Sequence, residues 1–167
     1  ITKEATSYVV SERILKKTPE QKALIRNHLE KFCGLYTGMS SRLEEFVDLF
    51  PIHPSYIDVF NKLYLIENRH ILKNISTTIK GIFDTTVPEN APGIISFDNY
   101  WPAIKSNGLL KSDPTISRVV GASQQLEDII TRAFPKPAYK PMAMQIIYAL
   151  SVHRLTTNGL DVQFGMT

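Results

Sequence analysis

The sequence predicts an all-α protein. Apolar residues recur at spacings of three and four along most of the chain, as they do on one face of a helix. Helix-start signals in which Thr or Asp precedes proline occur at 18–19 and 113–114. No alternation of apolar and polar residues extends beyond a few positions, so we expect a helical bundle without a sheet.

A central stretch at residues 50–83 is expected to form two helices around a polar corner. Pro54 suits a first helical turn, because its φ is fixed and its missing N–H is not needed there. His53 precedes this proline and is therefore kept out of the helical region. Apolar residues recur at helical spacing on both sides of 67–70. We expect a helical hairpin with Arg69 at its elbow, or one long helix that bends there.

Two helices are predicted before this stretch begins. The first covers 2–15, and Thr2 is its N-cap. The second opens with a capping box, because Thr18 precedes a proline and Gln21 stands three residues after the cap. We expect this second helix to extend to about Tyr36, where glycines loosen the chain.

A short amphipathic helix at 42–50 follows, with Ser40 or Ser41 as its cap and Pro51 as its stop. The segment 84–93 reads DTTVPENAPG, and its two prolines and final glycine predict a loop. We take 1–84 as a lid-like helical region, 85–93 as a boundary loop, and 94–167 as a second helical region.

The second region begins with a short extended piece at 94–97 and a short helix at 98–104. A longer helix starts at Pro114, with Ser112 or Asp113 as its cap, and stops near Phe134. The last helix starts at Lys140-Pro141. Apolar residues almost encircle it, so we expect it to be buried.

Composition excludes some classes of protein. Of 167 residues, 43% are hydrophobic and 21% charged, an ordinary globular balance. No run of about 18 apolar residues is present, so no membrane span is expected. The net charge of +3 does not by itself indicate nucleic-acid binding. The single cysteine, Cys33, cannot form an internal disulfide and favours a reducing, cytoplasmic location.

Known catalytic motifs are missing from the chain. The sequence contains no GxxxxGK[ST] phosphate-binding loop, no GxGxxG, no GxSxG and no HExxH. The four histidines offer no pair four residues apart on one helix, the spacing that lets two imidazoles face one metal ion. We therefore expect no metal site and no self-contained catalytic set.

Two features are candidate binding residues. Arg69 offers a fork of hydrogen-bond donors that suits phosphate, or it pairs with Glu67 at a helix end. Lys73 and Lys80 fall two turns apart on one helix, and Lys62 joins them if the hairpin folds back. These three lysines form either a stripe that tracks phosphates or an ordinary solvated face. Three aromatic residues stand near basic ones and are either stacking platforms or core side chains: Tyr100, Trp101 and Tyr139.

Four phrases carry a family resemblance. They are LFPIHPSYIDVF at 49–60, ENRHILKNIS at 67–76, VPENAPGIISFDNYWPAI at 87–104 and YKPMAMQIIYALSVHRLTT at 139–157. Together they resemble the large P-loop ATPases of BREX-type bacteriophage-exclusion systems and related large ATPases. The resemblance extends from about Thr18 to Gly159.

This resemblance implies a helical lid that follows an AAA-like nucleotide-binding core. The chain would then be a non-catalytic fragment, with both ends cut, of a parent ATPase that binds ATP and Mg. Its partners would be the upstream core, other defence proteins and DNA, and it could form an oligomer. Arg69 would match a second sensor that reaches the γ-phosphate. Two rival interpretations are a helical nucleic-acid-binding module, with a winged-helix-like unit starting in the last helix, and a scaffold domain.

Overall fold

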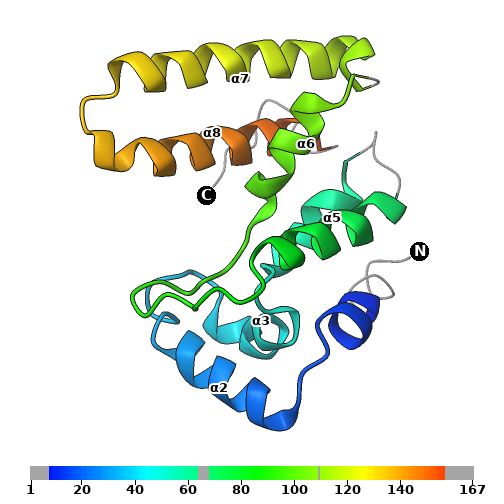
Figure 1. Ribbon diagram of the computed structural model, residues 1–167, viewed down its shortest axis with the longest axis vertical. Helices are drawn as coiled ribbons and strands as arrows, with labels where there is room; N and C mark the ends of the chain where they lie inside the picture. The colour runs from blue at the N-terminus through cyan, green and yellow to red at the C-terminus, as the bar shows by residue number, and fades with distance from the viewer. Residues whose placement is uncertain (1–7, 64–67, 109, 157–167) are drawn as a thin grey trace. The chain divides into compact units, whose positions relative to one another are not determined.

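The structure is a computed structural model that describes residues 8–63, 68–108 and 110–156; the side chains of 61 and 68–72 also lie outside the description. Within these ranges the chain consists of helices and loops, joined by two isolated β-bridges (Figure 1). The predicted all-α class is confirmed. No helix in these ranges has both the length and the apolar character that are needed to cross a bilayer.

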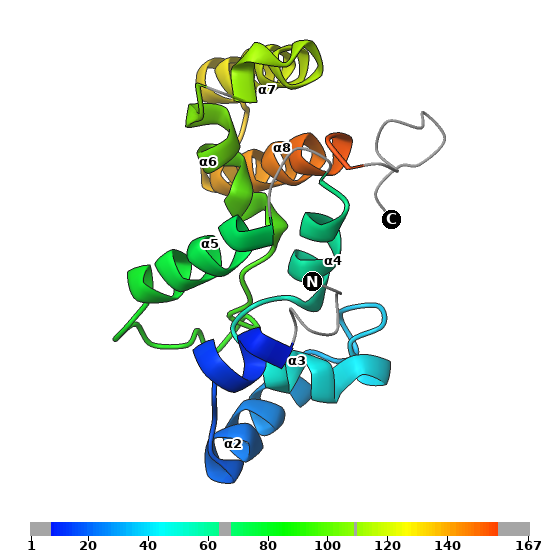
Figure 2. The same cartoon turned by 90° about the vertical axis from the view of Figure 1, so that its right-hand side faces the viewer.

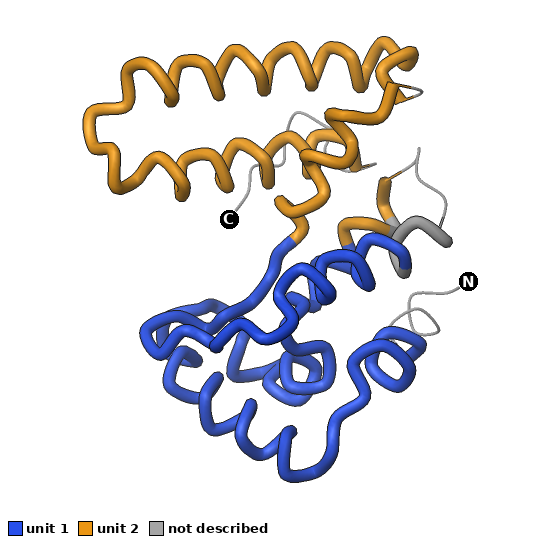
Figure 3. Tube along the Cα trace, viewed as in Figure 1, with its two compact units in different colours: residues 1–58, 67–96 blue, residues 59–66, 97–167 orange. Residues whose placement is uncertain are grey.

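The chain divides into two compact units (Figure 3). Unit 1 contains residues 1–58 and 67–96, and unit 2 contains 59–66 and 97–167. The chain passes from the first unit to the second inside helix α4 (Pro54–Asn61). The predicted boundary loop at 85–93 is irregular, but the division of the chain at that loop stays a prediction.

The first long helix of unit 1, α2 (Pro19–Glu30), starts as its sequence predicts. The hydroxyl of Thr18 accepts a hydrogen bond from the amide of Gln21 at 3.2 Å, and the Gln21 side chain accepts one from the Thr18 amide at 2.9 Å. The helix ends at Glu30 rather than near Tyr36, so the predicted length is wrong. From there the chain forms tight turns, in which the Phe32 amide bonds to the Leu29 carbonyl.

Before α2, the described part of the predicted first helix is a π-helical turn, η1 (Val10–Ile14), and residues 1–7 lie outside the description. After α2 come a 3₁₀ turn, η2 (Ser40–Arg42), and helix α3 (Leu43–Leu49). The predicted serine cap of α3 is wrong. Ser41 donates instead to the Gly38 carbonyl at 3.0 Å, and the N-cap position of α3 is Arg42, which forms no side-chain cap.

One apolar cluster fills the space between α2, α3 and the turn that joins them. Its buried side chains are Leu29, Phe32, Met39, Phe46, Val47 and Phe50. Pro51 ends α3, as expected, and follows Phe50 through a cis peptide bond.

The central stretch forms two helices, α4 and α5 (Asn68–Gly81), rather than one bent helix. Of the predicted elbow at 67–70, residue 67 and the side chains of 68–70 lie outside the description. Just before α4, Ile52 pairs with Ile95 in a parallel bridge, and the His53 amide donates to the Ile95 carbonyl at 2.9 Å. The predicted extended piece at 94–97 is therefore present as a single bridge.

Unit 2 is built on two long helices, α7 and α8, which run antiparallel and pack against each other (Figure 1). Figure 2 shows the same two helices from the side. Its elements are η3 (Phe97–Tyr100), α6 (Trp101–Ser106), η4 (Leu110–Ser112), α7 (Pro114–Ala133), η5 (Pro137–Tyr139) and α8 (Lys140–Arg154). The Asp113 carboxylate caps α7 by accepting from the amides of Thr115 and Ile116, at 2.8 and 3.1 Å. This confirms the cap and the proline start expected there.

The core of unit 2 gathers around α6. Trp101 and Tyr100 are 0 and 1% exposed, so these two rings are core side chains and not stacking platforms. The Tyr100 ring lies 5.2 Å from that of Phe60, measured between centroids. One face of α8 completes the core with Ile147 and Val152.

The expectation that α8 is buried all round is wrong. Met142, Ile146 and Leu150 are 58, 50 and 45% exposed. Helices and turns of unit 2 pack on α8 over one side, so its other side stays uncovered although it is equally apolar.

Candidate functional site

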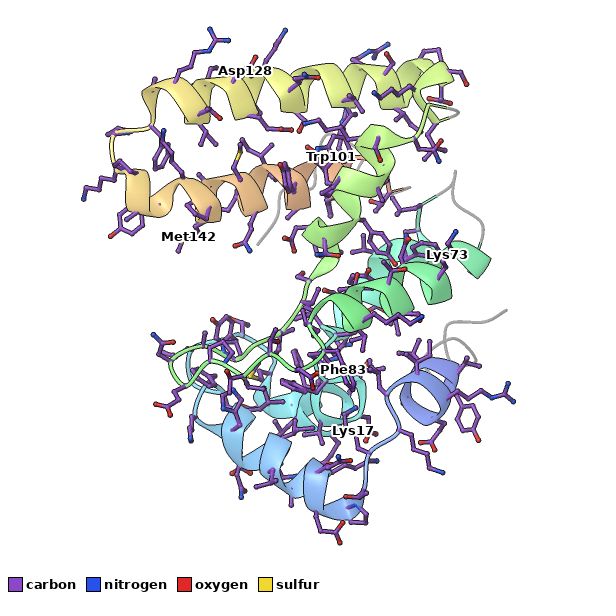
Figure 4. All side chains as sticks on the ribbon, viewed as in Figure 1. Lys17, Lys73, Phe83, Trp101, Asp128 and Met142 are labelled. Atoms are coloured by element: carbon purple, nitrogen blue, oxygen red, sulfur yellow. The ribbon has the colours of Figure 1, made fainter. Side chains whose placement is uncertain are left out.

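Helix α5 presents two of the predicted lysines on one side. Lys73 and Lys80 are both exposed and stand seven residues apart, which brings them to the same side of the helix (Figure 4 labels Lys73). Thr77, also exposed, lies between them. The opposite side carries Ile75, which is fully buried. The lysine side of α5 faces solvent because the opposite, apolar side is packed.

The two lysines are about 10 Å apart along the helix axis, from a rise of 1.5 Å per residue. That distance covers about three phosphates of one strand at 3.4 Å per nucleotide. Neither lysine forms an ion pair with any described residue. Their ammonium groups are thus available to an anion in solution.

Lys62, the third predicted member of the stripe, is exposed just after α4. It belongs to unit 2, whereas Lys73 and Lys80 belong to unit 1. A continuous stripe of three lysines stays a prediction.

Arg69 is the second residue of α5 and lies in its first turn. Its side chain is outside the description, as is the whole of Glu67, so the pairing of these two residues stays a prediction. Unpaired amides and the positive end of the helix dipole stand at a first helical turn.

One exposed ring near the lysines was not predicted. Phe83 lies two residues after the end of α5 and is 75% exposed (Figure 4). The apolar periodicity of the preceding helix ends at Ile82, and that break was the available signal. Of the rings that the sequence did single out, Tyr139 is half exposed, and the Lys136 ammonium lies 5.7 Å from its centroid.

His53 and Ser55 form a close pair at the start of α4. The His53 Nδ1 accepts a hydrogen bond from the Ser55 amide at 3.0 Å and lies 2.6 Å from the Ser55 hydroxyl. The ring also packs edge-on against Phe46, with 4.9 Å between centroids. Burial, with a smaller effect from the Arg42 charge, lowers the pKa of His53. The bond to the backbone makes this pair a cap of the turn at the start of α4.

Lys17 is a half-buried cation that sequence reasoning did not select. Its ammonium donates to the carbonyls of Leu15 and Asp48, at 2.9 and 2.7 Å (Figure 4). Burial lowers its pKa from 10.5 to about 8, against the attraction of the Asp48 charge. The side chain borders an open hollow of about 330 Å³, but its two backbone bonds make it a tether between this segment and α3.

The chain matches one known protein family. Residues 18–167 match the model of the DUF6079 second domain. The chain belongs to this family. No curated protein and no solved structure matches it.

The DUF6079 second domain thus combines a solvent-facing basic helix with helix-rich cores. Among the residues that the structure describes, no three His, Cys, Asp or Glu side chains gather as metal ligands. The arrangement on α5 suits binding of phosphates by charge, with Lys73, Thr77 and Lys80 as the described donors.

Proposed function

We propose that this domain is a non-catalytic, lid-like region of a large AAA-like P-loop ATPase in bacterial phage defence. In this role it couples the nucleotide state to the engagement of partners or DNA. The observation that carries the proposal is the position of Arg69 in the first turn of α5, directly after the connection from α4. The helical character of the domain and the resemblance of its four phrases to such ATPases support it. The family description "second domain" also fits a region that acts within a longer protein.

Arg69 acts in this proposal as the sensor of the γ-phosphate. Its guanidinium stays charged and offers paired donors to phosphate oxygens. A fixed cation at the transferred phosphoryl group stabilises the charge that develops there. When hydrolysis removes the γ-phosphate, the contact with Arg69 is lost and the lid is released. The parent protein supplies ATP and Mg at its upstream core, and we place the protein in the cytoplasm.

The test is ATP hydrolysis by the full-length protein that contains this domain. Arg69→Ala is expected to lower the hydrolysis rate by about 10²-fold, the effect of removing one positioned donor, with nucleotide binding retained. Arg69→Lys keeps the charge but loses the forked pair of donors, so its hydrolysis rate should lie between those of the wild type and Arg69→Ala. Lys73→Ala, on the same helix, is the matched control and should hydrolyse normally. Equal rates for all variants would remove Arg69 from the mechanism.

A second candidate function is nucleic-acid binding by the exposed side of α5. The observation that favours it is the pairing of Lys73 and Lys80 on one side, without ion-pair partners among the described residues. Two neutralised phosphates predict a slope of about −1.8 in a plot of log affinity against log salt for duplex DNA. The Lys73→Gln/Lys80→Gln variant should lose that slope. A chain that does not bind DNA at low salt excludes this function.

A further inference from the structure

The uncovered side of α8 carries a continuous row of apolar side chains. Tyr139, Met142, Ile146 and Leu150 are 50, 58, 50 and 45% exposed (Figure 4 labels Met142). Met142, Ile146 and Leu150 are spaced by four residues, which keeps them on one side of α8 over about 12 Å, and Tyr139 ends the η5 turn directly before the helix. We call these four residues the α8 stripe. Aligned apolar side chains of this kind are typical of surfaces that receive another helix.

Cations stand at the Tyr139 end of the α8 stripe. Residues 129–154 contain no Asp or Glu. Their cations are Lys136, Lys140, Arg154 and Arg132, of which Arg132 pairs with Asp128 of α7 at 3.4 Å.

Two of these cations are fixed at the Tyr139 end. Lys136 lies over the Tyr139 ring, and the Lys140 ammonium donates to the Thr131 carbonyl at 2.6 Å. The stripe therefore begins beside positive charge that its own segment does not neutralise.

We propose that the α8 stripe binds an amphipathic helix of a partner protein, one whose apolar residues are flanked by Asp or Glu. The apolar row supplies the contact area. The cations beside it attract acidic flanks, speed association and reject basic ones. This proposal does not rest on nucleotide binding, and it stands if the lid function fails.

Other occupants fit these features less well. A second copy of the chain would bring the same cations to the interface without an acidic residue from 129–154 to meet them. Helices that lie on membranes expose a charged face opposite the apolar one, whereas the opposite face of α8 is packed with Ile147 and Val152. Single-stranded nucleic acid binds proteins through several stacking rings, and only Tyr139 in the stripe is aromatic.

The test selects partners from a displayed library of amphipathic helices, in which the positions beside a fixed apolar stripe vary among Glu, Gln and Lys. The baits are the 167-residue chain and its Ile146→Asp variant. Leu24→Asp is the matched control, because Leu24 is an equally apolar residue, 71% exposed, in the other unit. Trp101 fluorescence and helical circular dichroism check that each variant is folded. Met142→Ser is a milder second variant of the stripe.

We expect the wild-type chain and Leu24→Asp to enrich Glu-flanked helices. Ile146→Asp should weaken the selected peptide at least tenfold, and Met142→Ser should weaken it measurably. Replacing the peptide's Glu residues by Lys should also weaken it at least tenfold. Enrichment of neutral or Lys flanks, or equal selection by the Ile146→Asp bait, overturns the proposal.

Three further outcomes point to a different occupant and also overturn it. One is a dimer of the chain that Ile146→Asp dissociates. The others are binding to anionic phospholipid vesicles or to a single-stranded oligonucleotide that the same substitution abolishes.

Discussion

An ion pair between Lys105 and Glu127 fastens α6 to α7. The Lys105 ammonium lies 2.6 Å from one carboxylate oxygen of Glu127, and the Ser123 hydroxyl donates to the other at 3.0 Å. The side chains of Lys105 and Glu127 are 29 and 11% exposed, and Ser123 is 2% exposed. Both oxygens of Glu127 thus have partners inside unit 2.

Glu127→Ala is predicted to lower the free energy of unfolding of unit 2 by about 3 kcal/mol. The buried Ser123 hydroxyl loses its acceptor, at a cost of about 1 kcal/mol, and the charge-assisted bond to Lys105 contributes about 2 kcal/mol. The second value is near the lower end of its range because Lys105 is partly exposed to water. The matched control is Asp128→Ala, which breaks a 3.4 Å pair with Arg132. That pair is exposed, so the control should cost at most about 0.5 kcal/mol.

Urea unfolding followed by tryptophan fluorescence measures both variants. Trp101 is the single tryptophan of the chain and is fully buried in α6, so its emission reports on unit 2. Lys105→Met combined with Glu127→Leu should recover most of the loss, since an apolar pair of similar size leaves no unpaired charge. A loss from Glu127→Ala no larger than that from Asp128→Ala would refute this reasoning.

Three further predictions concern unit 1. Because burial lowers the pKa of His53, the unfolded chain takes up this proton first, and stability should fall as pH drops below about 6.5. His53→Asn keeps an acceptor for the turn and should reduce that loss in urea titrations at pH 7.5 and 5; equal losses contradict the idea. Burial also lowers the pKa of Lys17 from 10.5 to about 8, so the unfolded chain holds more protons in that interval and stability should rise with pH there. Lys17→Met should flatten this rise, and an unchanged slope counts against it. Thr18→Ala removes half of the capping box and should cost about 1 kcal/mol in thermal unfolding followed by circular dichroism; an unaltered melting curve would show that the cap contributes nothing.

The helix starts could be predicted because their causes are local. Thr18 and Asp113 bond to amides two or three residues away, and these bonds are implied by the residue order. The end of α2 and the exposure of α8 could not be predicted in the same way. Both depend on which neighbours pack against a segment, and an apolar helix has the same composition whether one side is covered or all sides are.

Among the polar side chains, too, those set by local spacing could be predicted, and those with distant partners could not. Lys73 and Lys80 share one side of α5 because the helical period alone places them there. Lys17 and Glu127 have partners 31 and 22 residues away, so no local pattern announces either side chain. The ring of Phe83 was missed because the end of the apolar period at Ile82 does not show whether the next ring is buried or exposed.

The coupling of this domain to ATP is tested most directly in the full-length protein. The measurement is Mg-dependent ATP hydrolysis before and after α4 and α5 are locked together by an engineered cross-link, with the reduced, unlocked form of the same variant as control. The lid function predicts that the full-length protein hydrolyses ATP and that locking changes the rate at least tenfold, with recovery on reduction. A full-length protein without ATPase activity, or with the same rate when locked, contradicts it.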